Sequence, residues 1–283
     1  MFTPFTAGDG ETIPVQITGN GPPIVLLHEW AGDSHLWTPL AERLAHHFTV
    51  HAWDARGHGG HPSTGSEPPT LQRMADDLMD LIDRFALVRP LVVGHSMGAL
   101  TLWAHVLRHG CRHLGRICIL DQSPKLVTDD GWPFGIYGGF TVADNARLVA
   151  RMRADFPEGV LHLVGHGKNP KARDAYERNS RGMQRLRERL AALAPEPLIA
   201  CWQSLTAADL RPALPRITVP TLLIYGEASN YYGPEVGAHV QSQIAGSRLL
   251  VYEHSDHAPH LNRPEHFLED LAAFAAAPDK AAA

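Results

Sequence analysis

The sequence lacks paired cysteines, an excess of basic residues and any long apolar segment. Its three cysteines, Cys111, Cys118 and Cys201, form no CxxC pair and cannot all pair with one another, which excludes a disulfide framework and favours a reducing compartment. No apolar run approaches the roughly 18 residues that a membrane helix needs. With 25 basic and 30 acidic residues, the formal net charge of −5 argues against nucleic-acid binding. We therefore expect neither a nucleic acid nor a membrane as partner.

Metal-binding motifs and an export signal are missing as well. The 18 histidines are scattered, and neither HExxH nor a paired CxxC occurs, so we predict no metal and no cofactor. The first residues, MFTPFTAGDG, have neither the basic nor the apolar segment of a secretory signal, and we expect a cytoplasmic protein. A composition of 44% hydrophobic and 19% charged residues is that of an ordinary globular protein.

Short apolar runs framed by glycine and proline predict buried strands of a parallel sheet. Six runs lie within residues 19–29 and at 48–54, 90–95, 116–121, 221–226 and 248–253. Amphipathic segments alternate with them, most clearly at 70–85, where apolar residues recur at helical spacing. This alternation predicts an α/β fold, with a mostly parallel sheet covered by helices on both faces. Residues 2–17 predict a leading hairpin, and the tail beyond Pro278 is expected to fray.

The alternation stops after Asp121, and about a hundred residues pass before the next strand begins at Thr221. Such a stretch is too long for a loop inside a compact domain. Its helical patterns cover residues 144–155, 170–193 and 198–205. We therefore predict a core of residues 1–121 and 213–283 with an inserted helical lid at 122–212.

The predicted lid contains a basic segment, residues 168–190, with eight basic and three acidic side chains. Such a segment is either a patch for an anionic substrate or partner, or the solvated face of an amphipathic helix. Met183, Leu186, Leu190 and Leu193 keep helical spacing, which favours the solvated face.

The sequence GHSMG at 94–98 follows the strand run PLVVGH and precedes the helical run ALTLWAHVLRH. In this strand-turn-helix setting, the pattern G-x-S-x-G exposes a serine at the carboxyl end of a sheet, above a helix N-terminus. We therefore predict Ser96 as a nucleophile. Serine needs a general base, and we assign His257, on the loop after the last strand, with His254 and His260 as rivals. These three histidines could also bind a metal, but no second cluster supplies further ligands.

An oxyanion hole needs two backbone N–H groups aimed at one point. The amide of Met97, directly after Ser96, is one candidate. The loop after the first apolar run reads HEWAG at 28–32, and the amide of Trp30 is the second candidate. In the alternative interpretation, His28 and Trp30 only close the strand.

Together these motifs resemble the α/β-hydrolase superfamily, in the lidded branch that also holds haloperoxidase-like esterases. HEWAG resembles the family's H-G-x-x-G loop with Glu29 in place of glycine, DARGHG at 54–59 resembles its D-x-R-G-x-G turn, and GHSMG resembles its nucleophile elbow. The resemblance covers nearly the whole chain outside the lid. It implies an α/β-hydrolase fold, and structural roles for Asp54 and Arg56.

The sequence departs from the family pattern at the acid of the expected triad. Family members usually carry an aspartate shortly after the strand that corresponds to the fifth apolar run, and this chain has Ser229 there. Loss of the carboxylate function in a triad costs roughly 10⁴ in kcat. Some relatives, including zearalenone-type lactonases and quinolone dioxygenases, carry the acid after the preceding strand, where this chain has Asp121. We predict Asp121 as the acid rather than a cap of the lid, with Glu227 as the alternative; Asp256 is too close in sequence to His257.

Aromatic residues of the lid and of the segment after the fifth run predict an apolar pocket for a small-molecule substrate, a mid-sized hydrophobic ester or lactone. We expect it to be lined by Trp132, Phe134, Tyr137, Trp202 and Tyr231, although each of them could instead join lid to core. The resemblance implies hydrolysis of an ester or lactone through an acyl-enzyme on Ser96. A cofactor-independent dioxygenase similar to quinolone-cleaving relatives and a noncatalytic ligand-binding module are the alternatives. The natural substrate and the oligomeric state, including a homodimer, stay open.

Overall fold

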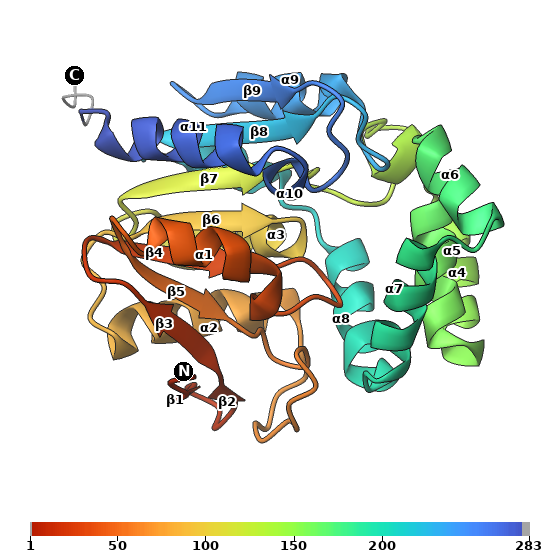
Figure 1. Cartoon of the computed structure of the whole chain (residues 1–283), viewed down its shortest axis with the longest axis horizontal. Coiled ribbons are helices and arrows are strands. Elements are labelled where there is room, and N and C mark those ends of the chain that lie inside the picture. The colour runs from red at the N-terminus through yellow and green to blue at the C-terminus, as the bar shows by residue number, and fades with distance from the viewer. Residues whose placement is uncertain (1, 279–283) are drawn as a thin grey trace.

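The computed structural model describes residues 2–278, so the tail that is predicted to fray lies outside the described residues. The main sheet consists of β3 (Val15–Thr18), β4 (Pro23–Leu27), β5 (Thr49–Trp53), β6 (Leu91–His95), β7 (Arg116–Leu120), β8 (Thr221–Gly226) and β9 (Arg248–Tyr252). Their order is β3-β5-β4-β6-β7-β8-β9 (Figure 1). Only β3 is antiparallel to its neighbour in this sheet. The six predicted runs therefore form the six parallel strands.

The main sheet separates two hydrophobic cores, because successive side chains of a strand point to opposite faces. In β4, Val25 and Leu27 belong to one core, and Ile24 and Leu26 belong to the other. The first core includes residues of α2 (Leu71–Arg84), α3 (Met97–His109) and α9 (Pro234–Gln243), and the second includes residues of α1 (Thr38–Leu44) and α11 (Pro264–Ala276). Helices thus cover both faces, as predicted, and the carboxyl ends of the strands are the edge where a site can form.

The N-terminal segment is fixed to the body by the turn that was predicted to be structural. A short hairpin forms between β1 (Phe5–Thr6) and β2 (Thr12–Ile13), and β3 then joins the main sheet. The buried guanidinium of Arg56 donates to Asp9 at 2.9 Å and to Asp77 at 2.6 Å. Asp54 accepts from the amide of Ser34 at 2.6 Å. These contacts hold the loops beneath the site without entering it.

Five helices lie between β7 and β8 in the chain. They are α4 (Val142–Ala154), α5 (Phe156–Gly165), α6 (Pro170–Glu177), α7 (Arg181–Ala191) and α8 (Pro195–Ala207). Figure 1 shows them beyond the carboxyl ends of the parallel strands, and we call them the helical group. The remaining described elements are α10 (Pro259–Asn262) and the 3₁₀ turns η1 (Ser34–Trp37), η2 (Ile136–Gly138) and η3 (Arg211–Arg216). In the described part of the chain, no helix is both long and apolar enough to cross a bilayer.

The helical group differs from the sequence prediction in two places. Helix α5 was not predicted, because Pro157 and Gly159 lower the helix propensity of its segment. Proline is tolerated in a first turn, and the side chain of Asp155 caps this helix by accepting from the Glu158 amide at 3.0 Å. The segment predicted as helical from 170 to 193 is interrupted between α6 and α7, where Asn179 takes a φ of 46°.

Candidate active site

Ser96 stands at a sharp turn between β6 and α3. Its φ of 52° and ψ of −113° are rare for a residue with a side chain, and such strain concentrates at functional turns. The two flanking glycines make the turn sterically feasible. A Cβ on Gly94 would lie 2.6 Å from the carbonyl of Gly98, and a Cβ on Gly98 would lie 2.3 Å from the carbonyl oxygen of Leu27 in β4. The close approach of α3 to β4 and β6 therefore places Ser96 at the carboxyl edge of the sheet.

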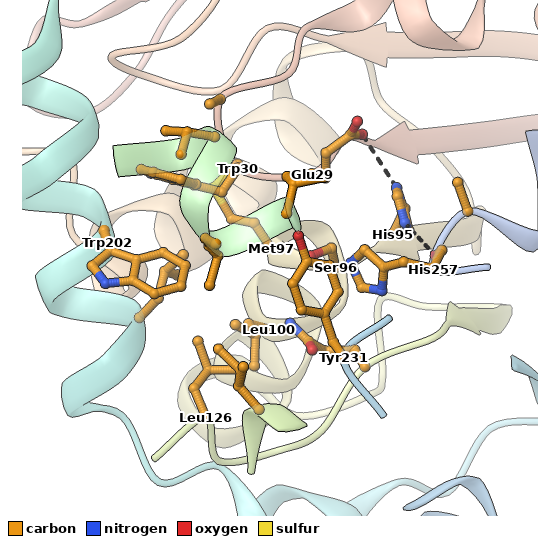
Figure 2. Close-up of a pocket in the computed structure, with 18 of the residues that line it drawn as sticks. Glu29, Trp30, His95, Ser96, Met97, Leu100, Leu126, Trp202, Tyr231 and His257 are labelled. Carbon is orange, nitrogen blue, oxygen red and sulfur yellow. Dashed lines mark hydrogen bonds and ion pairs between the residues drawn. The ribbon is translucent and has the colours of Figure 1, made fainter. Parts of the chain in front are cut away.

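The ring of His257, on the loop after β9, meets the carboxylate of Asp121 at the end of β7. His257 Nδ1 donates to Asp121 Oδ2 at 2.7 Å, and the Asp121 side chain is fully buried. Because Nδ1 is the donor, Nε2 of the neutral ring is an acceptor. Ser96 and His257 line the same cavity (Figure 2). No hydrogen bond joins the Ser96 hydroxyl to His257 within residues 2–278, as is common before substrate binds.

Two further donors hold the Asp121 carboxylate. The amide of Gly226 donates to Oδ1 at 2.9 Å, and the hydroxyl of Ser229 donates to Oδ2 at 2.6 Å. The ends of β7 and β8 are adjacent in the sheet, since Leu120 pairs with Ile224. Ser229, which occupies the place where the family's aspartate was expected, thus serves as a hydrogen-bond donor to the aspartate of the neighbouring strand. A buried carboxylate needs such donors, because burial without them is costly.

The two alternative acids lie elsewhere. Glu227 accepts from the backbone amide of His254 at 3.0 Å on the exposed side of the loop. Asp256 Oδ1 accepts from the backbone amides of Asn230 and His257, each at 2.7 Å. Asp256 therefore fixes the backbone of the His257 loop, whereas Asp121 contacts the ring.

The two rival histidines, His254 and His260, are not among the described residues that line the cavity of Ser96. The His254 side chain is exposed. His260 is buried and stacks on Trp37 with the ring centroids 4.7 Å apart. Burial lowers the pKa of His260 well below its ordinary value, and the neighbouring His95 adds to that shift. In the described residues, no three His, Cys, Asp or Glu side chains gather as a metal-binding group.

A second set of contacts, from Glu29 through His95, reaches the backbone of His257. His95 Nδ1 lies 3.2 Å from Glu29 Oε2, and His95 Nε2 lies 2.9 Å from the carbonyl oxygen of His257 (Figure 2). Desolvation alone would raise the pKa of Glu29, but the hydrogen bond and charge of His95 hold it well below its usual range. Both ring nitrogens of His95 thus face oxygen atoms, one of the Glu29 carboxylate and one of the His257 backbone. Sequence reasoning noted Glu29 only as a departure, and missed this pair.

The two residues whose amides are predicted to form an oxyanion hole line the same cavity. Trp30 and Met97 line the cavity, and neither amide donates to another protein group within residues 2–278. The Trp30 indole instead donates to the carbonyl of Leu198 in α8 at 2.8 Å, and its ring lies 4.9 Å from that of Trp202. The side chain therefore anchors the loop to α8.

A model of the alpha/beta hydrolase family matches residues 24–271. The chain belongs to that family. It is 30% identical to a pimeloyl-[acyl-carrier protein] methyl ester esterase from Nitrosospira multiformis, over 92% of this chain and 97% of the relative. It is 28% identical to 3-oxoadipate enol-lactonase 1 from Acinetobacter baylyi, over 95% of both chains. The solved structure of an esterase from Exiguobacterium antarcticum superimposes with a TM-score of 0.83 at 26% identity, covering 98% of this chain and 100% of the other.

The cavity of this alpha/beta hydrolase has a volume of about 220 Å³. The helical group supplies aliphatic and aromatic walls, including Val160, Leu163, Leu186, Leu190, Trp202 and Leu205. Tyr231 packs edge-on against the ring of His257, with the centroids 4.5 Å apart (Figure 2). The cavity therefore has polar, reactive groups on the sheet side and apolar walls on the side of the helices.

The structure places the predicted aromatic residues in two groups. Trp202 and Tyr231 line the cavity. Trp132, Phe134 and Tyr137 are not among the described residues that line it. The Trp132 indole donates to the carbonyl of Lys125 at 2.8 Å, and the Tyr137 hydroxyl donates to the carbonyl of Leu163, so both polar groups are engaged in packing. The aliphatic walls were missed, because such residues look the same in sequence whether they line a pocket or fill a core.

Proposed function

We propose that this chain is a serine hydrolase of carboxylic esters or lactones. Ser96 attacks the carbonyl carbon while His257 takes the hydroxyl proton and then gives it to the leaving oxygen. Asp121 orients the ring and stabilises the imidazolium, and the amides of Trp30 and Met97 receive the oxyanion. Water, activated by His257, then hydrolyses the acyl-enzyme. The observation that carries the proposal is the 2.7 Å contact of His257 with Asp121 beside the cavity that Ser96 lines.

The names of the relatives support the same class of substrate. One relative is a methyl ester esterase and another is an enol-lactonase, and each aligns over more than nine tenths of this chain. Both reactions attack an acyl carbon that is bonded to oxygen. An ester or a lactone of a small, partly hydrophobic acid is therefore the proposed substrate class.

We also propose that residues 122–212 form a lid over a core of residues 1–121 and 213–283. This proposal is supported by the different residues that the two parts contribute to the cavity. Val160, Leu186 and Trp202 of the helical group supply walls, whereas Ser96 and His257 follow strands of the sheet. A lid of this kind excludes water from the acyl-enzyme and selects the acyl chain.

A cytoplasmic location is part of the proposal as well. The three cysteines are free and buried, which suits a reducing compartment.

Active-site labelling tests the proposal directly. A fluorophosphonate probe should label the wild type and the exposed-serine control Ser242→Ala, but not Ser96→Ala. The same two active proteins should hydrolyse 4-nitrophenyl butyrate. Labelling of Ser96→Ala at the wild-type rate would place the nucleophile elsewhere and overturn the proposal.

A cofactor-independent dioxygenase is the second candidate. One observation favours it: His257 is hydrogen-bonded to Asp121, while no hydrogen bond links it to Ser96 in the described residues. In that reaction the His257–Asp121 pair would take a proton from the organic substrate, and Ser96 would only bind it. Oxygen uptake with a 3-hydroxy-4-quinolone, together with no ester hydrolysis, would favour this candidate over the hydrolase.

A further inference from the structure

We propose that Arg189 forms an anion subsite in the Ser96 cavity, so that the preferred substrate is an ester or lactone whose acyl part carries a second carboxylate. This inference rests on the proposed function, because it names the class of acid that the same site accepts. It also revises the sequence interpretation of the basic segment 168–190 as a solvated face.

One charged side chain of the cavity, that of Arg189, has no partner in the described part of the protein. Among the described residues that line the cavity, Glu29 and Arg189 are the ones with a formal charge besides the histidines. The Glu29 carboxylate is held by His95 at 3.2 Å. The Arg189 guanidinium has no hydrogen bond or ion pair to another described residue, although the residue is half-buried. The cavity therefore presents one positive charge without a protein partner.

The neighbouring arginines of α7 are placed differently. Arg187 donates to Asn179 at 2.8 Å and to Glu158 at 3.3 Å, so its guanidinium joins helices of the group to one another. Arg185 is exposed and is not among the residues that line the cavity. Arg189 follows Leu186 by three residues, which places both on the face of α7 that the cavity meets.

The guanidinium of Arg189, a half-buried residue, favours a carboxylate as its ligand. A charged group that is partly removed from water is costly unless a counter-charge joins it. The planar fork of arginine matches a carboxylate through two parallel hydrogen bonds. Most of the other residues that line the cavity with Arg189 and Ser96 are apolar, with Leu163, Leu186 and Trp202 among them. The matching molecule therefore has an ester or lactone carbonyl at one end, a short apolar chain, and a carboxylate at the other end.

A pair of matched esters tests the subsite. Mono-4-nitrophenyl glutarate carries the free carboxylate, and its methyl ester, methyl 4-nitrophenyl glutarate, masks it. We expect the wild type to prefer the free acid in kcat/KM, and Arg189→Gln to lower that preference by tenfold or more, as expected for loss of a hydrogen bond between charged groups. The control Arg185→Gln should keep the wild-type preference. An unchanged preference in Arg189→Gln would overturn the subsite.

A binding measurement separates this inference from the proposed function. Glutarate should bind the wild type in a calorimetric titration, and its affinity should fall by tenfold or more in Arg189→Gln but not in Arg185→Gln. If the wild type hydrolyses no ester yet shows this pattern, the hydrolase proposal fails and the anion subsite stands. Equal glutarate affinity in all three proteins contradicts the subsite. Inorganic phosphate that binds through Arg189 where glutarate does not would contradict the assignment to a carboxylate.

Discussion

The loops at the carboxyl ends of the strands and the helical group α4–α8 enclose one cavity but contribute different kinds of side chain. Every group proposed for the chemistry lies at this edge of the sheet, in the loops at Trp30, Ser96, Asp121 and His257 or at the first residue of α3, Met97. The helical group contributes hydrophobic walls and one guanidinium. The reacting geometry and the choice of substrate therefore reside in separate parts of the chain.

The two regions also differ in how their polar groups are held. The Asp121 carboxylate is fully buried and accepts three hydrogen bonds from three different residues. Ion pairs of the helical group, such as Arg147 with Asp144, lie at the surface, where such pairs contribute little stability. At the edge of the sheet, several hydrogen bonds hold the buried Asp121 side chain in one position. In the helical group, a substitution in the cavity wall should therefore cost less activity than one at the edge of the sheet. This comparison makes predictions that separate the rate of the reaction from the choice of substrate.

The largest effect on kcat is expected from Asp121, which directly follows β7. Asp121→Asn should lower kcat by roughly 10⁴, because the amide cannot stabilise the imidazolium by charge. The loss should be the same for short and long esters, since the acid does not contact the cavity walls. Steady-state kinetics on a series of 4-nitrophenyl esters measures both features.

The matched control for that variant is Glu227→Gln. Glu227 bonds to the backbone of an exposed turn, so we expect near wild-type rates. If Glu227→Gln loses 10⁴ in kcat while Asp121→Asn does not, the roles of the two carboxylates are reversed.

A smaller effect on kcat is expected from the contact between Glu29 and His95, which supports the His257 loop. Glu29→Gln keeps the shape of the side chain but removes the charge that faces His95, and hydrogen bonds to charged groups contribute about 1.5–3 kcal/mol. We predict a drop in kcat of about tenfold to a hundredfold with little change in substrate preference, as for other groups of the sheet edge. Glu253→Gln, an exposed change near the same loop, is the control. A wild-type kcat in folded Glu29→Gln protein would show that the pair does not position His257.

The smallest effect on rate, and the largest on selectivity, is expected from α8. Trp202→Ala removes the ring that packs on Trp30 and enlarges the cavity. We expect the preference in kcat/KM to shift toward longer or bulkier acyl chains by about tenfold, since one lost apolar contact changes discrimination by roughly 1–3 kcal/mol. The kcat on the best ester should stay within about tenfold of wild type. Rates on acetate, hexanoate and decanoate esters measure the shift. An equal loss of kcat/KM on all three esters would contradict the assignment of substrate choice to the helical group.

Much of the fold and of the sheet-edge geometry followed from local patterns. The strand runs and the G-x-S-x-G turn predict their structures because the relevant constraints, apolar runs and the lack of a Cβ at Gly94 and Gly98, lie within a few residues. The family membership predicted from these motifs is confirmed by the match to residues 24–271. The roles of Ser96, His257 and Asp121 stay predictions until variants are measured.

The walls of the cavity followed poorly from the sequence. Three of five predicted aromatic residues lie outside the cavity, because their burial depends on where the 122–141 segment packs. Trp132, for example, packs against His239 of α9 with the ring centroids 5.1 Å apart, a contact between positions more than a hundred residues apart in the chain. The contact between Glu29 and His95 likewise joins the loop after β4 to the end of β6, and the two residues are 66 positions apart in the chain.

By itself, the sequence determined the alternating strands and helices, the strained serine turn and the absence of an aspartate at position 229, since each is a property of neighbouring residues. Only the tertiary structure decided that Ser229 donates to Asp121, that Glu29 faces His95, and that Arg189 meets the cavity while Arg187 does not. The physical reason is that hydrogen bonds and unpaired charges depend on distances between side chains of different elements, and those distances exist only once the sheet and the helical group have packed.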